Sequence, residues 1–139
     1  MVRSVTASGR ASRFGRVKDY LRNADKEICV LVQIETLTAL ENLEEIASTP
    51  GVDGVFVGPA DLAASMGHIG IPSHPDVQSA IHSAVDVLNR LGKPAGILSM
   101  NDEDSERYID WGFSFVAVGS DLSLLARSSD NLARRFQEN

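Results

Sequence analysis

The sequence predicts a parallel α/β fold built from four consecutive βα units. Short apolar runs typical of buried strands alternate with longer segments whose apolar residues recur at helical spacing. There are no hairpin signals between the runs, so the strands are expected to run parallel with right-handed helical crossovers. Four such units form either an open α/β sheet or half of a (β/α)8 barrel, and the pattern alone is compatible with both.

The expected strands are short and rich in apolar residues. They cover residues 28–34, 52–57, 95–98 and 113–118. The first run, Ile28-Cys-Val-Leu-Val-Gln-Ile34, consists almost entirely of apolar, largely β-branched residues, which is typical of a strand buried on both faces. Cys29, the single cysteine, lies in this run and is expected to be a small buried hydrophobe.

Helices are expected after each strand, with recognisable start and stop signals. Thr36, Asn101 and Asp121 are the predicted N-caps of three of them. A short helix is expected over residues 61–66. The strongest amphipathic pattern covers residues 75–91, where proline occupies the first helical position and glycine follows the last.

Length and composition indicate one compact domain with an apolar core. The chain has 139 residues, of which 43% are hydrophobic, and no run approaches the roughly 18 apolar residues that cross a membrane. A cytoplasmic protein is expected, because the first residues contain no secretory signal. The net charge of −6 argues against a nucleic-acid partner.

Residues 1–26 form a basic leading segment, expected to be a loop with a short helix around residues 17–24, ahead of the main unit at residues 27–139. Six basic side chains gather in this segment: Arg3, Arg10, Arg13, Arg16, Lys18 and Arg22. A solvated loop and an interface with an acidic surface are both compatible with this pattern.

Two carboxylates follow consecutive predicted strands, Glu35 after the first and Asp61 after the second. In a parallel sheet all strand carboxyl ends lie at one edge, and neighbouring strands are only about 4.8 Å apart. Two carboxylates without a nearby histidine or cysteine suit a hard cation such as Mg²⁺ or Mn²⁺. The competing interpretation is structural: Asp61 caps a helix and Glu35 is a solvated side chain.

The segment Gly58-Pro-Ala-Asp61 predicts a site for an anion beside these carboxylates. Free backbone N–H groups at a helix start bind anions, so a substrate carboxylate is expected on the amides of Ala60 and Asp61. The histidines are weaker candidates. His74 precedes a proline and is expected to act as a cap or turn residue, and His82 is expected to be exposed on a helix.

Two stretches of the chain resemble the class II pyruvate aldolases of the HpcH/HpaI family. They are Gln33-Ile-Glu-Thr36 and, at the matching distance, Gly51-Val-Asp-Gly-Val-Phe-Val-Gly-Pro-Ala-Asp-Leu62. Three more stretches support the resemblance: His74-Pro75, Gly92-Lys-Pro-Ala-Gly-Ile-Leu98 and Phe115-Val-Ala-Val-Gly-Ser-Asp121.

The resemblance implies a (β/α)8 barrel, with residues 27–139 as strands five to eight. It implies cleavage of a 4-hydroxy-2-oxo acid to pyruvate and an aldehyde, with Mg²⁺, Mn²⁺ or Co²⁺ as the cofactor. The implied metal ligands are Glu35 and Asp61. The implied substrate-binding residues are Gln33, Gly58, Ala60, Asp61 and Leu98, of which Leu98 is a wall of the pocket.

The chain also departs from the family, whose members have about 250 residues, a usual barrel length. The family's catalytic histidine and pyruvate-binding arginine belong to the first half, so no catalytic residue is assigned. Met1 is expected to be a start inside a longer frame, or the product of a split or truncated gene. A half barrel is expected to form a homo-oligomer or to pair with an N-terminal half. The alternatives are a non-catalytic protein that binds metal and 2-oxo acid, and a citrate-lyase-like enzyme.

Overall fold

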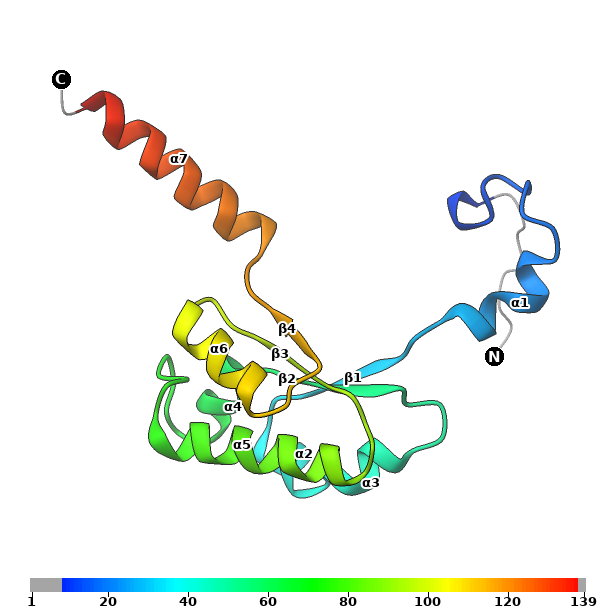
Figure 1. Ribbon diagram of the computed structural model, residues 1–139, viewed down its shortest axis with the longest axis horizontal. Helices are drawn as coiled ribbons and strands as arrows, with labels where there is room; N and C mark the ends of the chain where they lie inside the picture. The colour runs from blue at the N-terminus through cyan, green and yellow to red at the C-terminus, as the bar shows by residue number, and fades with distance from the viewer. Residues whose placement is uncertain (1–8, 138–139) are drawn as a thin grey trace.

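A computed structural model describes residues 9–137 and contains one four-stranded parallel sheet with strand order β1-β2-β3-β4. The strands are β1 (Leu31–Ile34), β2 (Gly54–Val57), β3 (Ala95–Leu98) and β4 (Phe115–Ala117). The helices are α1 (Tyr20–Glu27), α2 (Leu37–Glu41), α3 (Leu43–Ser48), α4 (Pro59–Ser65), α5 (Pro75–Arg90), α6 (Asp102–Asp110) and α7 (Asp121–Gln137), with a 3₁₀ turn at Arg10–Ser12. The predicted parallel (βα)4 unit is therefore confirmed (Figure 1).

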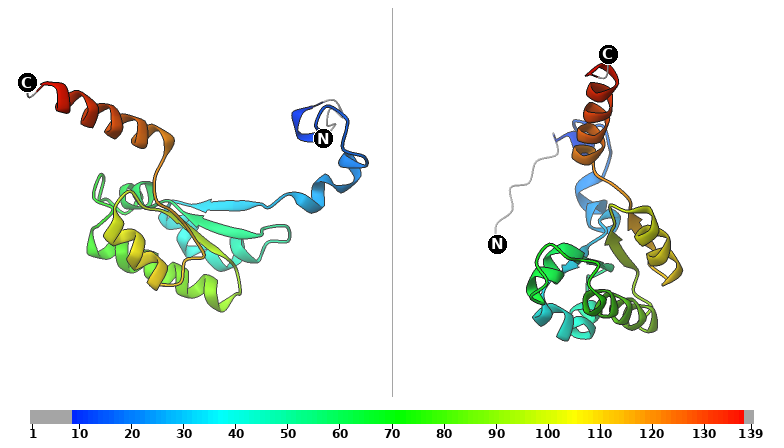
Figure 2. Two further views of the ribbon diagram at one scale, coloured as in Figure 1. Left: turned by 45° about the horizontal axis from the view of Figure 1, so that its top comes forward. Right: turned by 90° about the vertical axis from the view of Figure 1, so that its left-hand side faces the viewer.

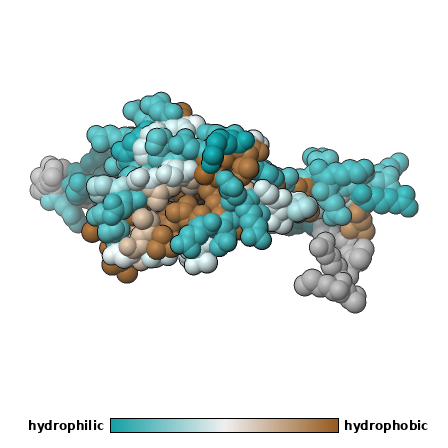
Figure 3. All heavy atoms as spheres, turned by 90° about the horizontal axis from the view of Figure 1, so that it is seen from below, coloured by the Kyte–Doolittle hydropathy of each residue, from teal (hydrophilic) through white to brown (hydrophobic). Residues whose placement is uncertain are grey.

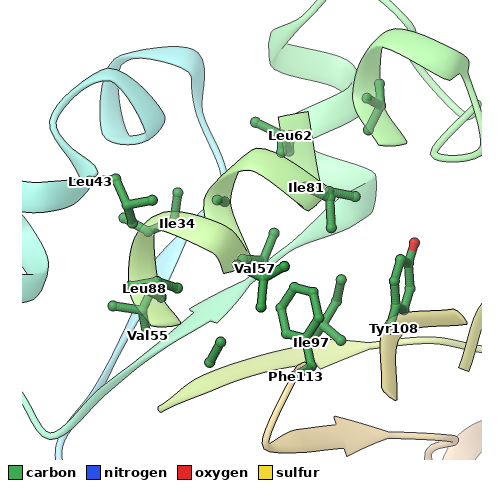
Figure 4. Packing of buried hydrophobic residues seen from close by; sticks show 14 of the residues in the cluster. Ile34, Leu43, Val55, Val57, Leu62, Ile81, Leu88, Ile97, Tyr108 and Phe113 are labelled. Atoms are coloured by element: carbon green, nitrogen blue, oxygen red, sulfur yellow. The ribbon is translucent and has the colours of Figure 1, made fainter. Parts of the chain in front are cut away.

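One side of the sheet carries the apolar core. The strand register places Ile34 beside Val57 and Val57 beside Ile97, and all three side chains are fully buried. These side chains pack against residues of the covering helices, among them Leu62 of α4 and Leu88 of α5 (Figure 4). The amphipathic pattern predicted for α5 is explained by this contact, because the apolar face of that helix lies over the strands.

The other side of the sheet is left uncovered by helices α2–α6. The register places Gln33, Phe56, Gly96 and Phe115 in one row across the four strands. The rings of Phe56 and Phe115 approach to 5.9 Å across Gly96, where a Cβ atom would lie 2.7 Å from Phe56. Gly96 therefore allows the two rings to meet over β3. We call this side the open face.

The open face corrects two expectations for the first strand. β1 is not buried on both faces, because Leu31 and Gln33 are exposed while only Ile34 is fully buried. Cys29 precedes the strand and is exposed, so the prediction of a buried cysteine is wrong. An apolar run indicates that a strand has apolar surroundings, but it does not indicate whether residues of this chain provide them on both faces.

The predicted helix starts are largely confirmed. The hydroxyl of Thr36 accepts a hydrogen bond from the amide of Ala39, and Asn101 accepts one from the amide of Asp104. At the last helix, Ser120 replaces Asp121 as the cap, since its hydroxyl accepts a hydrogen bond from the amide of Ser123. Asp121 is instead the first residue of α7.

Helices α1 and α7 extend away from the body on the side of the open face (Figures 1 and 2). α7 carries large apolar side chains that are exposed, among them Leu122, Leu125 and Phe136. The short helix expected around residues 17–24 lies at Tyr20–Glu27, and Arg3 of the basic segment lies outside the described residues. Over residues 9–137, no helix is long and apolar enough to cross a membrane.

The helix-covered side contains a groove of about 460 Å³ between α2, α3 and α5. Its lining includes Leu40, Leu43, Ala84 and Val87, and apolar atoms are visible near the middle of this side (Figure 3). None of the predicted site residues lines this groove.

Candidate functional site

The predicted strand-end cluster forms where β1 and β2 finish side by side. The amide of Gly58 donates a hydrogen bond to the carbonyl of Ile34 at 3.0 Å, which ties the two strand ends together. The side-chain amide of Gln33 donates to Oε2 of Glu35 at 2.8 Å. Gln33 and Glu35 alternate with the buried Ile34, so both side chains belong to the open face.

Gly58 provides the space in which this pair lies. A Cβ atom at Gly58 would approach Nε2 of Gln33 to 3.0 Å, Cβ of Glu35 to 3.2 Å and Oε2 of Glu35 to 3.5 Å. The Glu35 carboxylate therefore lies directly over the backbone that enters α4. Glycine is required here by close approach and not by backbone conformation, because its φ of −99° is open to any residue.

Helix α4 carries Asp61 in its first turn, shortly after Gly58. Gly58 is the N-cap and Pro59 is the first helical residue, so the helix starts two residues earlier than expected. Asp61 lies in the first turn and is exposed, and it makes no side-chain hydrogen bond or ion pair within residues 9–137. The structural interpretation of Asp61 as an N-cap is therefore not supported, and its carboxylate is available for a ligand.

Ala60 and Leu98 share a cavity of about 250 Å³ that opens next to the strand-end cluster. Pro59, Ser99, Met100, Asn101, Asp104, Tyr108 and Pro72 complete its lining. Leu98 continues the open face at the end of β3 and is 39% exposed. The structure thus brings together two of the predicted substrate-binding residues from separate βα units.

A polar network that the sequence did not reveal supports one wall of this cavity. The amide of Gln78 donates to the hydroxyl of Tyr108 at 2.9 Å and to the carbonyl of Pro72 at 2.8 Å. Arg107 donates to Oε1 of Gln78 at 2.9 Å and also binds Asp104. Burial raises the pKa of Tyr108 above the ordinary tyrosine value, so the hydroxyl remains a protonated donor to a higher pH than in an exposed tyrosine. Gln78 and Tyr108 are 30 positions apart, and no local pattern links them.

The histidines occupy other positions than the strand ends. His74 accepts a hydrogen bond from the amide of Asp76 and is the N-cap of α5, which confirms its expected role. His82 is exposed as expected, and its ring lies 4.5 Å from that of Trp111. His68 and His74 stack on each other in the loop between α4 and α5.

The donor set at the strand ends fits a hard divalent ion. Glu35 uses one oxygen to accept the Gln33 hydrogen bond, and its second oxygen makes no hydrogen bond within residues 9–137. Asp61 supplies a second carboxylate without a side-chain hydrogen bond or ion pair within residues 9–137, in the helix turn that follows Gly58. Oxygen ligands of this kind are those that Mg²⁺ and Mn²⁺ prefer.

The fold and the strand-end residues define a parallel α/β protein with an acidic site at the carboxyl edge of its sheet. Comparison with known proteins gives the family. A model described as HpcH/HpaI aldolase/citrate lyase matches residues 5–128. The chain belongs to the HpcH/HpaI aldolase/citrate lyase family, as the resemblance predicted.

The relatives are about twice as long as this chain. A pyruvate aldolase from Rhizobium etli is 58% identical over 135 residues, which are 97% of this chain and 53% of that protein. A 4-hydroxy-2-oxo-heptane-1,7-dioate aldolase from Klebsiella pneumoniae is 53% identical over 134 residues, which are 96% and 51% of the two chains. The chain therefore spans about half the length of these curated relatives.

A solved structure leads to the same conclusion about the fold. The HpcH/HpaI aldolase/citrate lyase family protein from Burkholderia cenocepacia superposes with a TM-score of 0.86 at 37% identity. The match covers 98% of this chain and 53% of that one. The expected correspondence to about half of the family fold is therefore confirmed.

Proposed function

We propose that this chain is the part of a metal-dependent aldolase that holds the metal and the 2-oxo acid. The reaction is cleavage of a 4-hydroxy-2-oxo acid to pyruvate and an aldehyde. The observation that carries the proposal is the placement of Glu35 over Gly58, held by Gln33 at the entrance to α4, in a chain whose relatives are named aldolases.

Each residue of the site has a distinct task in this proposal. Glu35 and Asp61 would hold a divalent ion, Mg²⁺, Mn²⁺ or Co²⁺. Gln33 fixes the orientation of the Glu35 carboxylate through the 2.8 Å hydrogen bond and presents its amide to the substrate. When bound, the metal ion would supply Lewis-acid polarisation of the 2-oxo group.

The remaining residues position the substrate. The first amides of a helix have no acceptor within the helix, so those of Ala60 and Asp61 are suited to the carboxylate of the 2-oxo acid. Leu98 forms an apolar wall of the adjoining cavity, where it limits access of water to the reacting carbons. The resemblance assigns the proton-transferring histidine and a substrate-binding arginine to the first half of the family fold, so cleavage is expected to require that half.

A pyruvate-release assay tests the proposal. This chain would be supplied with Mn²⁺ and a 4-hydroxy-2-oxo acid, alone and together with the first half of a homologous aldolase. We expect release only in the combined sample, and loss of that release with Glu35→Gln. A folded chain that releases no pyruvate in either setting would reject the lyase proposal.

A second candidate is a protein that binds metal and 2-oxo acid without cleaving anything. It is favoured by one observation: the residues proposed to bind metal and carboxylate lie at the strand ends, whereas the histidines of residues 9–137 lie on the α4–α5 loop and on α5. Calorimetric titration of Mn²⁺ and then pyruvate separates the two candidates. Binding that depends on Glu35 without pyruvate release in the combined sample supports this second candidate.

A further inference from the structure

The loop between α4 and α5 folds back so that two histidines meet. The amide of His68 donates to the carbonyl of Ala63 at 2.7 Å, which fixes the loop to the end of α4. Two successive turns follow, because the amide of Ile71 donates to His68 at 2.9 Å and the amide of His74 donates to Ile71 at 3.0 Å. The imidazoles of His68 and His74 consequently stack with their centroids 3.5 Å apart and their planes 13° apart.

Asp76 brings a carboxylate to the same place. Oδ2 of Asp76 lies 3.6 Å from Nε2 of His68 and 3.7 Å from Nδ1 of His74. One donor atom from each of the three residues falls within 4.8 Å of the others. The two histidine side chains are only 26% and 32% exposed, so the loop and α5 hold them in place before any ligand arrives.

We propose that His68, His74 and Asp76 form a binding site for a transition-metal dication, with Zn²⁺ as the best match. Two imidazoles and one carboxylate are the nitrogen and oxygen donors that zinc takes, with water as the fourth ligand. Donor atoms around a tetrahedral zinc ion are about 3.3 Å apart, given bonds of about 2.0–2.1 Å. The distances from Asp76 to the two imidazoles are already close to this value. This donor set differs from the oxygen-only pair Glu35 and Asp61, which suits a hard cation.

Binding requires a defined local rearrangement. The lone pairs of stacked rings lie in two separate, nearly parallel planes, so one imidazole must turn out of the stack for both to meet a single ion. Nδ1 of His74 also accepts the amide hydrogen of Asp76 at 3.2 Å, and coordination through this atom would replace that capping bond. The carboxylate of Asp76 offsets the unfavourable field that the start of α5 exerts on a cation.

The ion would fasten the end of α4 to the start of α5. α4 begins at Pro59 and carries Asp61, so the loop that holds His68 belongs to the same βα connection as the candidate substrate site. Zinc at this position would therefore act as a structural clamp on the connection, independently of the cation expected at Glu35.

Calorimetric titration of Zn²⁺ into the 139-residue chain tests the site, supported by the visible absorption of Co²⁺, whose intensity reports tetrahedral coordination. We expect one Zn²⁺ per chain, and a loss of affinity of about ten-fold or more in His68→Gln and in Asp76→Asn. His74→Asn is the third variant, because asparagine is a good N-cap and can keep the start of α5 intact. Zn²⁺ should also raise the melting temperature of the wild-type chain and not that of His68→Gln.

Two variants serve as controls. His82→Gln removes an exposed histidine of α5 that lies outside the cluster and should bind Zn²⁺ as the wild type does. Glu35→Gln removes the other candidate site and should also leave this zinc affinity unchanged. The proposal is overturned if the wild type takes up no Zn²⁺, if His68→Gln binds as tightly as the wild type, or if only Glu35→Gln abolishes binding.

Discussion

The two faces of the sheet use the same strands for opposite purposes. On the helix-covered face, Ile34, Val57 and Ile97 form a fully buried row. On the open face, the adjacent row contains Gln33, Phe56 and Phe115, and neither Gln33 nor Phe115 is buried. The covered face stabilises the unit, whereas the open face carries the side chains of the candidate site and is left uncovered by helices α2–α6.

The largest expected effect comes from removing apolar volume on each face in turn. Ile97→Ala should lower the free energy of unfolding by about 2–5 kcal/mol, because it leaves a cavity among packed side chains. Phe115→Ala, at a side chain 53% exposed, should cost less than about 1 kcal/mol. Urea denaturation of the two variants and the wild type measures the difference.

The relative cost of these two substitutions shows whether the open face is covered by another chain in solution. If Phe115→Ala costs as much as Ile97→Ala and the protein self-associates, then the open face is covered in solution by a second copy of the chain. Sedimentation of the two variants over a range of concentrations shows whether the chain self-associates. Equal losses together with a strictly monomeric chain would contradict the division into a covered and an open face.

The next effect concerns the chemistry of the open face. Glu35→Gln preserves the shape of the side chain and removes its charge, so the affinity for Mn²⁺ should fall by about 100-fold or more. Glu41→Gln makes the same change at an exposed position of α2 and is the matched control. Calorimetric titration of Mn²⁺ gives both dissociation constants, and indistinguishable values would remove Glu35 from the set of metal ligands.

Most of the fold was predictable because periodic patterns report local structure. The four strands, the caps at Thr36 and Asn101 and the start of α5 at Pro75 all depend on residues within a few positions of one another. The position of Glu35 near the start of α4 could also be predicted from the sequence, because the carboxyl ends of parallel strands lie at one edge of the sheet. These conclusions need only the strand order and the spacing along the chain.

The parts that were missed depend on contacts between distant residues. The apolar run at residues 28–34 looks like a doubly buried strand, and nothing in its composition reveals that one face is uncovered. The network of Gln78, Arg107 and Tyr108 joins two helices across about 30 positions. The stack of His68 on His74 arises from two consecutive turns whose geometry a residue pattern does not specify.

A smaller effect is expected at the place where the open face is most crowded. Gly96→Ala would place a Cβ atom 2.7 Å from the ring of Phe56 and 3.1 Å from that of Phe115. The overlap should cost about 1–3 kcal/mol of unfolding free energy. Gly119→Ala, where a Cβ atom meets nothing within 4 Å, should change it by less than about 0.5 kcal/mol. In urea denaturation, the double variant of Gly96→Ala and Phe56→Ala should lose less unfolding free energy than the two single variants lose in sum. A purely additive result would exclude ring crowding as the cause.

The smallest effect is expected at Tyr108, a residue that belongs to both regions. Its ring is part of the buried core, and the residue also lines the cavity beside Leu98. Tyr108→Phe removes the 2.9 Å hydrogen bond from Gln78 and should cost about 1 kcal/mol at pH 7.

Burial raises the pKa of Tyr108 above its ordinary value of 10.0, so the unfolded chain loses this proton first as the pH rises. The stability that depends on the protonated hydroxyl is complete below pH 10 and declines as the pH rises from there through the folded pKa. Because phenylalanine does not titrate, the wild type should lose its advantage over the variant in urea denaturation above pH 10, and a constant difference from pH 7 to pH 11 would show that Tyr108 is not protected from water.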